Sequence, residues 1–174
     1  MAKEERLAFA AKTEKFVVNE FLKNGYIAEI IPFKSAKQNH IEGDWVLYRG
    51  NIKINIEQKA SYGDHCISFN VEDDDKIYSI EDFIGEIKSD FIIGLANYNK
   101  PMHEEYILYK MDAFKKYVLS DLNNSIIRDS NDDREHNPRY INLLNPKLRA
   151  NVENYMFSGS DAIKNLYNKI VEIV

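Results

Sequence analysis

The chain has 174 residues, of which 44% are hydrophobic and 29% are charged, and its formal net charge is −5. These values are typical of one globular domain over residues 1–174, and they disfavour a disordered chain or a membrane protein. The acidic balance disfavours a protein that coats nucleic acid with positive charge, but it allows contact through one local basic surface. Because Cys66 is the only cysteine, an internal disulfide and a four-cysteine metal site are excluded.

We expect no secretory signal at the beginning of the chain. Residues Met1–Arg6 are charged, and no apolar segment with a small-residue cleavage site follows them. No run approaches the roughly 20 apolar residues that are needed to span a bilayer. We therefore expect a cytoplasmic protein with no membrane partner.

The first three predicted elements are a helix, a strand and a loop. Residues 2–24 place apolar side chains every three or four positions and are followed by Gly25, which predicts an amphipathic helix. The Ile-rich segment Tyr26–Phe33 predicts a strand. The polar segment Lys34–Gly43 is interpreted as a loop.

A β-hairpin is the clearest prediction of the sequence. The alternating segments Asp44–Tyr48 and Ile52–Lys59 flank a Gly50-Asn51 pair, which is typical of a two-residue turn. Such a turn pairs Arg49 with Ile52 and, further along the ladder, Asp44 with Glu57.

The rest of the chain predicts further strands and helices and one polar insertion. The segment Cys66–Val71 predicts a third hairpin strand, Glu72–Asp75 an acidic loop, and Ser79–Lys88 a helix that is capped by Ser79. The apolar run Phe91–Tyr98 predicts a strand that is buried on both faces, and Glu105–Lys110 predicts another strand. A helix at Asp112–Leu119, a polar surface insertion at Ser120–Arg139 and a helix from about Asp161 complete the chain. This order predicts an α/β fold with a mixed sheet and helices packed on it. We place the core at about residues 10–119, the insertion at about 120–140 and the C-terminal helix at about 160–174.

Two carboxylates and a lysine share one face of the predicted hairpin. Because strand side chains alternate, Trp45, Leu47, Ile52, Ile54 and Ile56 face the core, whereas the other face carries Asp44, Glu57 and Lys59. The Cβ atoms of residues directly opposite each other are about 4.5 to 5.5 Å apart, so the two acids repel unless a positive group lies between them. A hard cation such as Mg²⁺ fills that role, and Lys59 could touch a water or a phosphate. This combination suits phosphodiester hydrolysis.

These residues resemble the motif of the PD-(D/E)XK nuclease superfamily, which includes restriction endonucleases and Holliday-junction resolvases. The match consists of Gly43-Asp44, of Glu57-Gln58-Lys59 after a hairpin-length gap, and of a preceding helix that carries Glu14. It covers roughly residues 10–98 and departs from the family at Gly43, where the family name has proline. The resemblance implies a restriction-endonuclease-like α-β-β-β-α-β core with flanking helices.

The resemblance also implies a role for each matched residue. Asp44, Glu57 and the backbone carbonyl of Gln58 would bind Mg²⁺, for which Mn²⁺ would substitute. Lys59 would orient or activate the water, and Glu14 would complete the site from the first helix. The implied activity is a Mg²⁺-dependent endonuclease that hydrolyses DNA, either site-specifically, as restriction and homing enzymes do, or at junctions.

Several alternatives stay open. The acid-x-Lys pattern also occurs at Asp74–Lys76 and Glu86–Lys88, but only Glu57 ends a strand with a partner aspartate in register. Glu20 competes with Glu14 for the helix position, although Glu14 lies on the apolar stripe, where an acid needs a partner. The hairpin face could also be an ordinary solvated surface of an unrelated α+β domain. A non-catalytic binding or assembly module of the same fold and an RNA endonuclease are the alternative functions.

Local basic clusters supply candidate contacts to nucleic acid. In the segment before Asp44, Lys34 and Lys37 could contact phosphates while Gln38, Asn39 and His40 lie near base edges. A second basic group consists of Arg128, Arg134, Arg139, Lys147 and Arg149. A chain of this size that cuts both strands of a duplex needs two active sites, so the partners we predict are duplex or branched DNA and a second copy of the chain in a homodimer.

Overall fold

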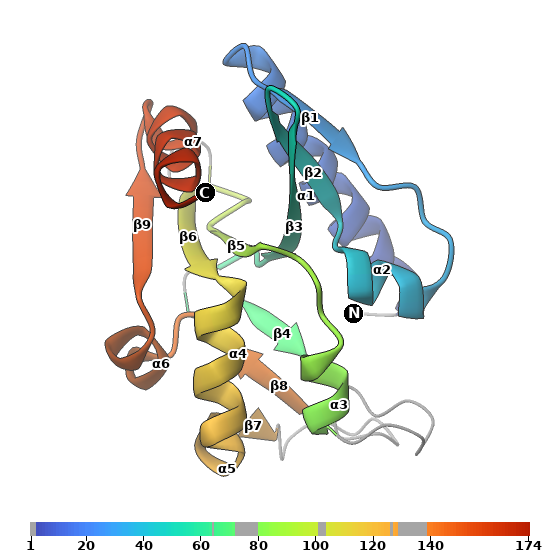
Figure 1. Ribbon diagram of the computed structural model, residues 1–174, viewed down its shortest axis with the longest axis vertical. Coiled ribbons are helices and arrows are strands. Elements are labelled where there is room, and N and C mark those ends of the chain that lie inside the picture. The colour runs from blue at the N-terminus through green and yellow to red at the C-terminus, as the bar shows by residue number, and fades with distance from the viewer. Residues whose placement is uncertain (1–2, 64, 72–79, 101–103, 126, 129–138) are drawn as a thin grey trace.

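The computed structural model describes residues 3–63, 65–71, 80–100, 104–125, 127–128 and 139–174. The strands are β1 (Ile27–Ile30), β2 (Trp45–Arg49), β3 (Ile52–Ala60), β4 (Ser68–Asn70), β5 (Phe91–Ala96), β6 (Glu105–Lys110), β7 (Ile127–Arg128), β8 (Arg139–Asn142) and β9 (Asn154–Ser158). The helices are α1 (Lys3–Lys23), α2 (Ala36–Glu42), α3 (Ile80–Gly85), α4 (Met111–Ser120), α5 (Leu122–Ser125), α6 (Pro146–Asn151) and α7 (Ala162–Ile173). The predicted α/β class is confirmed (Figure 1).

The strands form two sheets. The central sheet has six strands in the order β1-β2-β3-β5-β6-β9, and the smaller sheet has three in the order β4-β8-β7. Strands β3 and β5 run parallel, whereas every other neighbouring pair of the central sheet is antiparallel. The predicted mixed sheet is therefore confirmed, and the crossover from β3 to β5 contains β4 and α3.

Two apolar cores lie on opposite faces of the central sheet. On one face, α1 and α7 pack on the sheet through residues that include Phe21, Trp45 and Leu166. On the other face, α3, α4, α6 and the small sheet enclose a second core that includes Phe69 and Phe114. In Figure 1 the small sheet lies below with α3 and α4, and α1 and α7 lie above.

Strand β5 divides the two cores and is buried along its whole length. Alternate side chains enter different cores, with Phe91 and Ile93 in the first and Ile92 and Ala96 in the second. Because neither face of such a strand meets solvent, apolar and polar side chains do not alternate along it, and its sequence is a continuous apolar run. The prediction of a doubly buried strand is confirmed.

Two expectations about local structure were wrong, and one strand of the central sheet was not predicted. The segment Lys34–Gly43 is not a loop, because residues 36–42 form α2, whose N-cap residue Ser35 accepts a hydrogen bond from the Gln38 backbone N–H at 3.2 Å. The strand at Cys66–Val71 exists as β4, but it is not part of the hairpin. It pairs with β8 in the small sheet, because β5 occupies the position beside β3. The central sheet also extends beyond the predicted core to β9.

The polar insertion is described only in part. Residues 122–125 form α5 and residues 127–128 form β7, so this part of the segment contains short regular elements. The acidic loop at 72–75, the cap at Ser79 and the remainder of the insertion fall outside the described residues. Within the described ranges, no helix is long and apolar enough to cross a membrane.

Candidate active site

The β2–β3 hairpin has the register that its turn predicts. Arg49 pairs with Ile52, and the ladder continues without a bulge to Trp45 and Ile56. Asp44 lies just before β2, and its backbone N–H donates to the Ile56 carbonyl at 2.8 Å, which extends the pairing by one hydrogen bond. The hairpin therefore brings Asp44 to the part of β3 that carries Glu57.

A lysine ammonium lies between the two hairpin carboxylates. Lys59 Nζ is 2.5 Å from Glu57 Oε1 and 3.6 Å from Asp44 Oδ2. It also donates to the backbone carbonyl of Gln58 at 3.0 Å. The side chains of Glu57, Asp44 and Lys59 are 5%, 16% and 26% exposed, so the cluster is largely shielded from water while Lys59 keeps an opening to solvent.

Glu14 adds a third carboxylate from α1. Burial and the charge of Asp44 raise its pKa to about 7, and Lys59 acts in the other direction. Glu14 is therefore close enough to interact electrostatically with Asp44 and with Lys59. Glu20 instead pairs with Lys23 at 2.7 Å, so of the two candidate glutamates the structure brings Glu14 to the cluster.

Backbone and core contacts hold Asp44 and Gln58 in place. Asp44 Oδ2 accepts the backbone N–H of Gln58 at 2.7 Å, so the carboxylate reaches across to β3. The side chain of Gln58 enters the opposite face of the sheet, where its Oε1 accepts the indole N–H of Trp45 at 2.9 Å. Gln58 therefore joins the site through its backbone and the core through its side chain.

Negative charge dominates the cluster. Burial and, after it, the charge of Asp44 raise the pKa of Glu57 to about 8, although the ion pair and hydrogen bond with Lys59 act in the other direction. Burial alone would lower the pKa of Lys59, but the charges of Asp44 and Glu57 outweigh it and raise that pKa. One lysine thus offsets only part of the repulsion among three acids, so the site would attract a further cation.

The donor atoms fit a hard divalent cation. Glu57 Oε2 is buried and has no hydrogen-bond partner among the described residues, so one carboxylate oxygen has free lone pairs. The carboxylate of Asp44 and the carbonyl of Gln58 are the other oxygens of the cluster. Within the described ranges, no group of three or more His, Cys, Asp or Glu side chains is placed to hold a metal ion. Mg²⁺ takes one or two carboxylates and fills its remaining positions with water and phosphate oxygens, so this smaller donor set suffices for it.

Gly43 fixes how the chain enters the site. It has φ 95° and ψ −175°, a conformation that is essentially restricted to glycine. A Cβ atom at this position would lie 2.7 Å from both the Ile56 carbonyl oxygen and Ser89 Oγ. Proline, which the PD-(D/E)XK motif has at this position, needs φ near −65° and cannot adopt this backbone.

We expect Gly43→Ala to lower the free energy of unfolding by at least about 2 kcal/mol, because it combines backbone strain with a backbone clash. Gly50→Ala is the matched control, since Gly50 also has a positive φ, of 58°, but its Cβ would meet no atom within 4 Å. We expect it to cost about 1 kcal/mol. Urea unfolding measures both free energies. An equal loss of stability in the two variants would show that the short contacts with Ile56 and Ser89 at Gly43 do not matter.

The segment expected to contact nucleic acid is the α2 region, and most of its polar side chains make internal contacts. Gln38 donates to Glu42 Oε1 at 3.0 Å, and Asn39 Oδ1 accepts the backbone N–H of Lys34 at 3.3 Å. Lys34 is exposed, whereas the side chain of Lys37 lies outside the described part. Base contacts by Gln38 and Asn39 remain a prediction that requires these bonds to be exchanged.

His40 is tied to α3. Its Nε2 is 2.7 Å from the Phe83 carbonyl oxygen, and its ring stacks on the Phe83 ring at 3.6 Å. Burial lowers the pKa of His40. The charge of Lys59 also lowers it, whereas the charge of Asp44 raises it. The sequence placed His40 near base edges, but the structure places it at the contact between α2 and α3 beside the carboxylate cluster.

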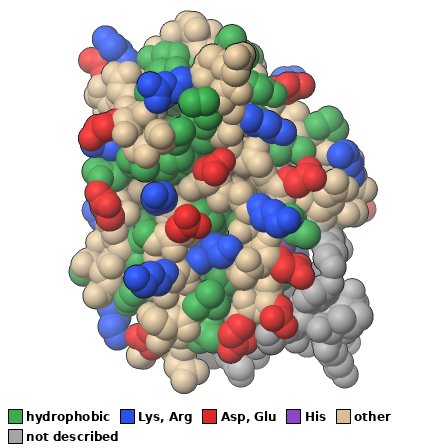
Figure 2. Space-filling view, in the orientation of Figure 1, with side chains coloured by type: hydrophobic (Ala, Val, Ile, Leu, Met, Phe, Trp, Pro, Cys, Tyr) green, Lys and Arg blue, Asp and Glu red, His purple; other side chains and the backbone are tan. Residues whose placement is uncertain are grey.

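The two described side chains of the second basic group lie apart from the first group. Lys147 and Arg149 lie on α6, which is on the opposite side of the view in Figure 1 from α2. The side chains of Arg128, Arg134 and Arg139 are outside the described part. On the face drawn in Figure 2, positive and negative side chains are interspersed, so that face carries no continuous basic surface.

Compared with protein-family models and with curated proteins, the sequence matches none. We therefore infer function from the geometry and charge of the site.

Proposed function

We propose that the chain is a metal-dependent endonuclease that hydrolyses phosphodiester bonds in DNA. The observation that carries the proposal is the buried cluster of Asp44, Glu57 and Lys59, in which Glu57 Oε2 has no partner among the described residues. The order of elements from α1 to β5 and the parallel pairing of β3 with β5 support a restriction-endonuclease-like core.

Each residue of the cluster has a separate task. Asp44, Glu57 and the Gln58 carbonyl would hold Mg²⁺ or Mn²⁺, and a bound ion would polarise the phosphate and lower the pKa of a coordinated water. Lys59 is cationic and partly exposed, so its ammonium can orient the attacking water and offset negative charge that develops on the phosphate. Glu14 would accept a hydrogen bond from a water at the side of α1.

The reaction is attack of a water oxygen on phosphorus. An oxygen–phosphorus bond forms, the bond from phosphorus to one sugar oxygen breaks, and a proton of the water passes to solvent while the leaving oxygen gains one. The substrate would be duplex or branched DNA. Cutting both strands at one position requires two active sites, so we propose that a homodimer with two-fold symmetry is the active form.

One observation favours a second candidate function. Because Lys59 already forms a 2.5 Å ion pair with Glu57, the cluster can be satisfied without a metal ion. The chain would then be a non-catalytic binding or assembly module of the same fold. Calorimetric titration with Mn²⁺ separates the two cases, because only the nuclease needs a divalent ion at Asp44 and Glu57.

We expect the purified protein to nick or linearise supercoiled plasmid, or to cut a synthetic four-way junction, when Mg²⁺ or Mn²⁺ is present. Removing the ion with EDTA should abolish cleavage, and adding it back in excess should restore cleavage. Gel analysis of plasmid, junction and single-stranded RNA under the same conditions checks this. Cleavage of RNA alone would favour the RNA endonuclease, and no metal-dependent cutting of any substrate would favour the non-catalytic module.

A further inference from the structure

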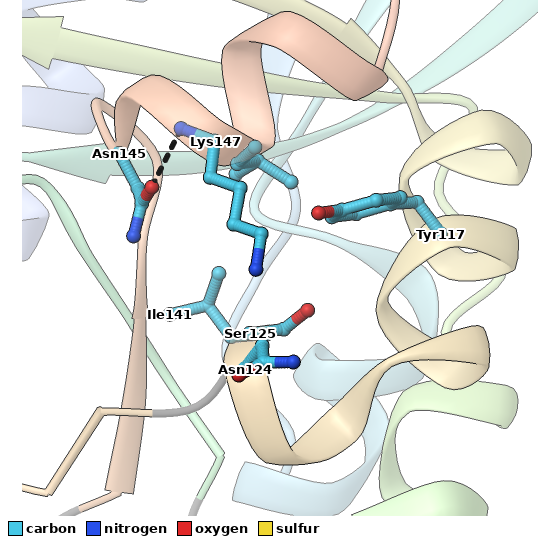
Figure 3. A pocket seen from close by; sticks show the side chains of 7 residues that line it. Tyr117, Asn124, Ser125, Ile141, Asn145 and Lys147 are labelled. Atoms are coloured by element: carbon cyan, nitrogen blue, oxygen red, sulfur yellow. Dashed lines mark hydrogen bonds between the residues drawn. The ribbon is translucent and has the colours of Figure 1, made fainter.

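A small hollow lies away from the carboxylate cluster, between α4, α5, β8 and α6. Its polar lining comes from Tyr117 of α4, Asn124 and Ser125 of α5, and Asn145 and Lys147 at the start of α6 (Figure 3). Ile141 and Leu148 supply the apolar part of the lining. The hollow and its open mouth together enclose about 220 Å³. Because part of this space is open to solvent, the hollow is shallow and suits only a small group.

Ser125 presents a buried hydroxyl to the hollow. The residue is only 8% exposed, and its Oγ has no hydrogen-bond partner among the described residues. Buried polar groups are normally paired, and each unpaired one costs free energy. A ligand oxygen in the hollow would supply the missing partner.

Lys147 adds a positive charge that the described residues do not neutralise. Its backbone N–H donates to Asn145 Oδ1 at 2.8 Å, which fixes the start of α6. Its side chain is not used in that contact, and Figure 3 shows it extending toward Ser125, with the Tyr117 hydroxyl directed into the same space. No hydrogen bond or ion pair to the ammonium of Lys147 is found within the described ranges.

Among the residues that the structure describes, no acidic side chain lines the hollow, and three of its lining side chains are donors without an internal partner. A lysine ammonium and two hydroxyl groups can all donate, and Lys binds phosphate as a compact point charge. The nearby carboxylate of Asp121 accepts from Asn124 Nδ2 at 2.9 and 3.1 Å, so its charge is partly satisfied within α5. This chemistry selects a small anion with several acceptor oxygens.

We propose that this hollow binds a phosphate group through the ammonium of Lys147 and the hydroxyl groups of Ser125 and Tyr117. The phosphate can be free inorganic phosphate or the terminal phosphate of a nucleic acid. The site is independent of the carboxylate cluster, because none of its residues belongs to that cluster and no divalent ion takes part.

The direct test is calorimetric titration of the full chain with inorganic phosphate, in EDTA and at constant ionic strength set with chloride. We expect saturable binding, a loss of affinity of at least about tenfold in Lys147→Gln, and a severalfold loss in Ser125→Ala. Lys164→Gln is the matched control, because Lys164 is an exposed lysine on α7, and it should bind as the unaltered chain does. Absence of saturable binding, or equal affinity in Lys147→Gln, would overturn the proposal.

Folding does not confound this test. Lys147 is exposed and Ser125 Oγ makes no hydrogen bond among the described residues, so both variants should unfold at or above the temperature of the unaltered chain. Displacement of phosphate by a trinucleotide distinguishes the two sources. Displacement by the 5′-phosphorylated form but not by the 5′-hydroxyl form identifies a terminal phosphate of nucleic acid as the ligand, and displacement by neither identifies free phosphate. Glu57→Gln should leave phosphate binding unchanged, which separates this site from the proposed nuclease activity.

Discussion

Glu57→Gln should abolish metal-dependent cleavage of DNA, lowering its rate by at least about a thousandfold, which corresponds to about 4 kcal/mol of transition-state stabilisation. The substitution keeps the size of the side chain and removes the charge that would hold the metal ion. Glu172→Gln is the matched control, because Glu172 is an exposed carboxylate on α7 whose partner is Lys169 of the same helix. Single-turnover cleavage at saturating Mg²⁺ measures both rates, and an active Glu57→Gln variant would contradict the proposed site.

The same substitution should leave the metal-free fold intact or make it more stable. The raised pKa of Glu57, about 8, means that the folded protein binds more protons than the unfolded chain between pH 4.5 and 8. The contribution of this residue to stability is therefore complete below pH 4.5 and is lost as the pH rises through about 8. In EDTA, we expect Glu57→Gln to show a shallower fall in the free energy of unfolding from pH 5 to 8. A steeper fall would show that the carboxylate is stabilising when ionised.

Lys59→Gln should lower the free energy of unfolding in EDTA by about 2 kcal/mol or more and reduce cleavage at least about a hundredfold. Without the ammonium, the carboxylates of Asp44, Glu57 and Glu14 face one another with no positive charge between them. A bound divalent ion replaces part of that charge, so Mg²⁺ should stabilise the variant more than it stabilises the unaltered chain. Thermal unfolding with and without Mg²⁺ measures this difference.

Lys53→Gln is the matched control for that experiment, because Lys53 is an exposed lysine on the same strand, near the turn. It should change neither stability nor the response to Mg²⁺ by more than about 0.5 kcal/mol. If Mg²⁺ stabilised Lys59→Gln no more than Lys53→Gln, the cluster would be a structural ion pair, and the non-catalytic module would be the better explanation.

The sequence predicted structure best where the relevant contacts are close along the chain. The register of β2 and β3 followed from a two-residue turn and strict alternation, and it placed Asp44 and Glu57 on one face. The apolar stripe of α1 favoured Glu14 over Glu20, and Glu14 is the residue that interacts with the cluster. These features depend on local periodicity, which a sequence displays directly.

The elements that were missed depend on single capping contacts or on distant partners. Helix α2 has seven residues and is too short to show periodicity, so its start is marked only by the Ser35 cap. Strand β4 is short, and nothing in its own sequence identifies β8 as its partner. The position of the Lys59 ammonium between two carboxylates and the unpartnered hydroxyl of Ser125 depend on side-chain packing in three dimensions, which periodicity does not encode.

The pairing of β4 with β8 has a consequence for the order in which the chain folds. Strands β1, β2 and β3 and helix α1 are neighbours along the chain, so they can assemble early with little loss of loop entropy. Strand β4 must wait for β8, which comes from the last quarter of the chain. Until β8 is made, Phe69 of β4 and the preceding Ile67 are not covered by the second core. During synthesis, the carboxylate cluster would thus form before the second core closes, and the exposed β4 segment would be the part of the nascent protein most prone to aggregation.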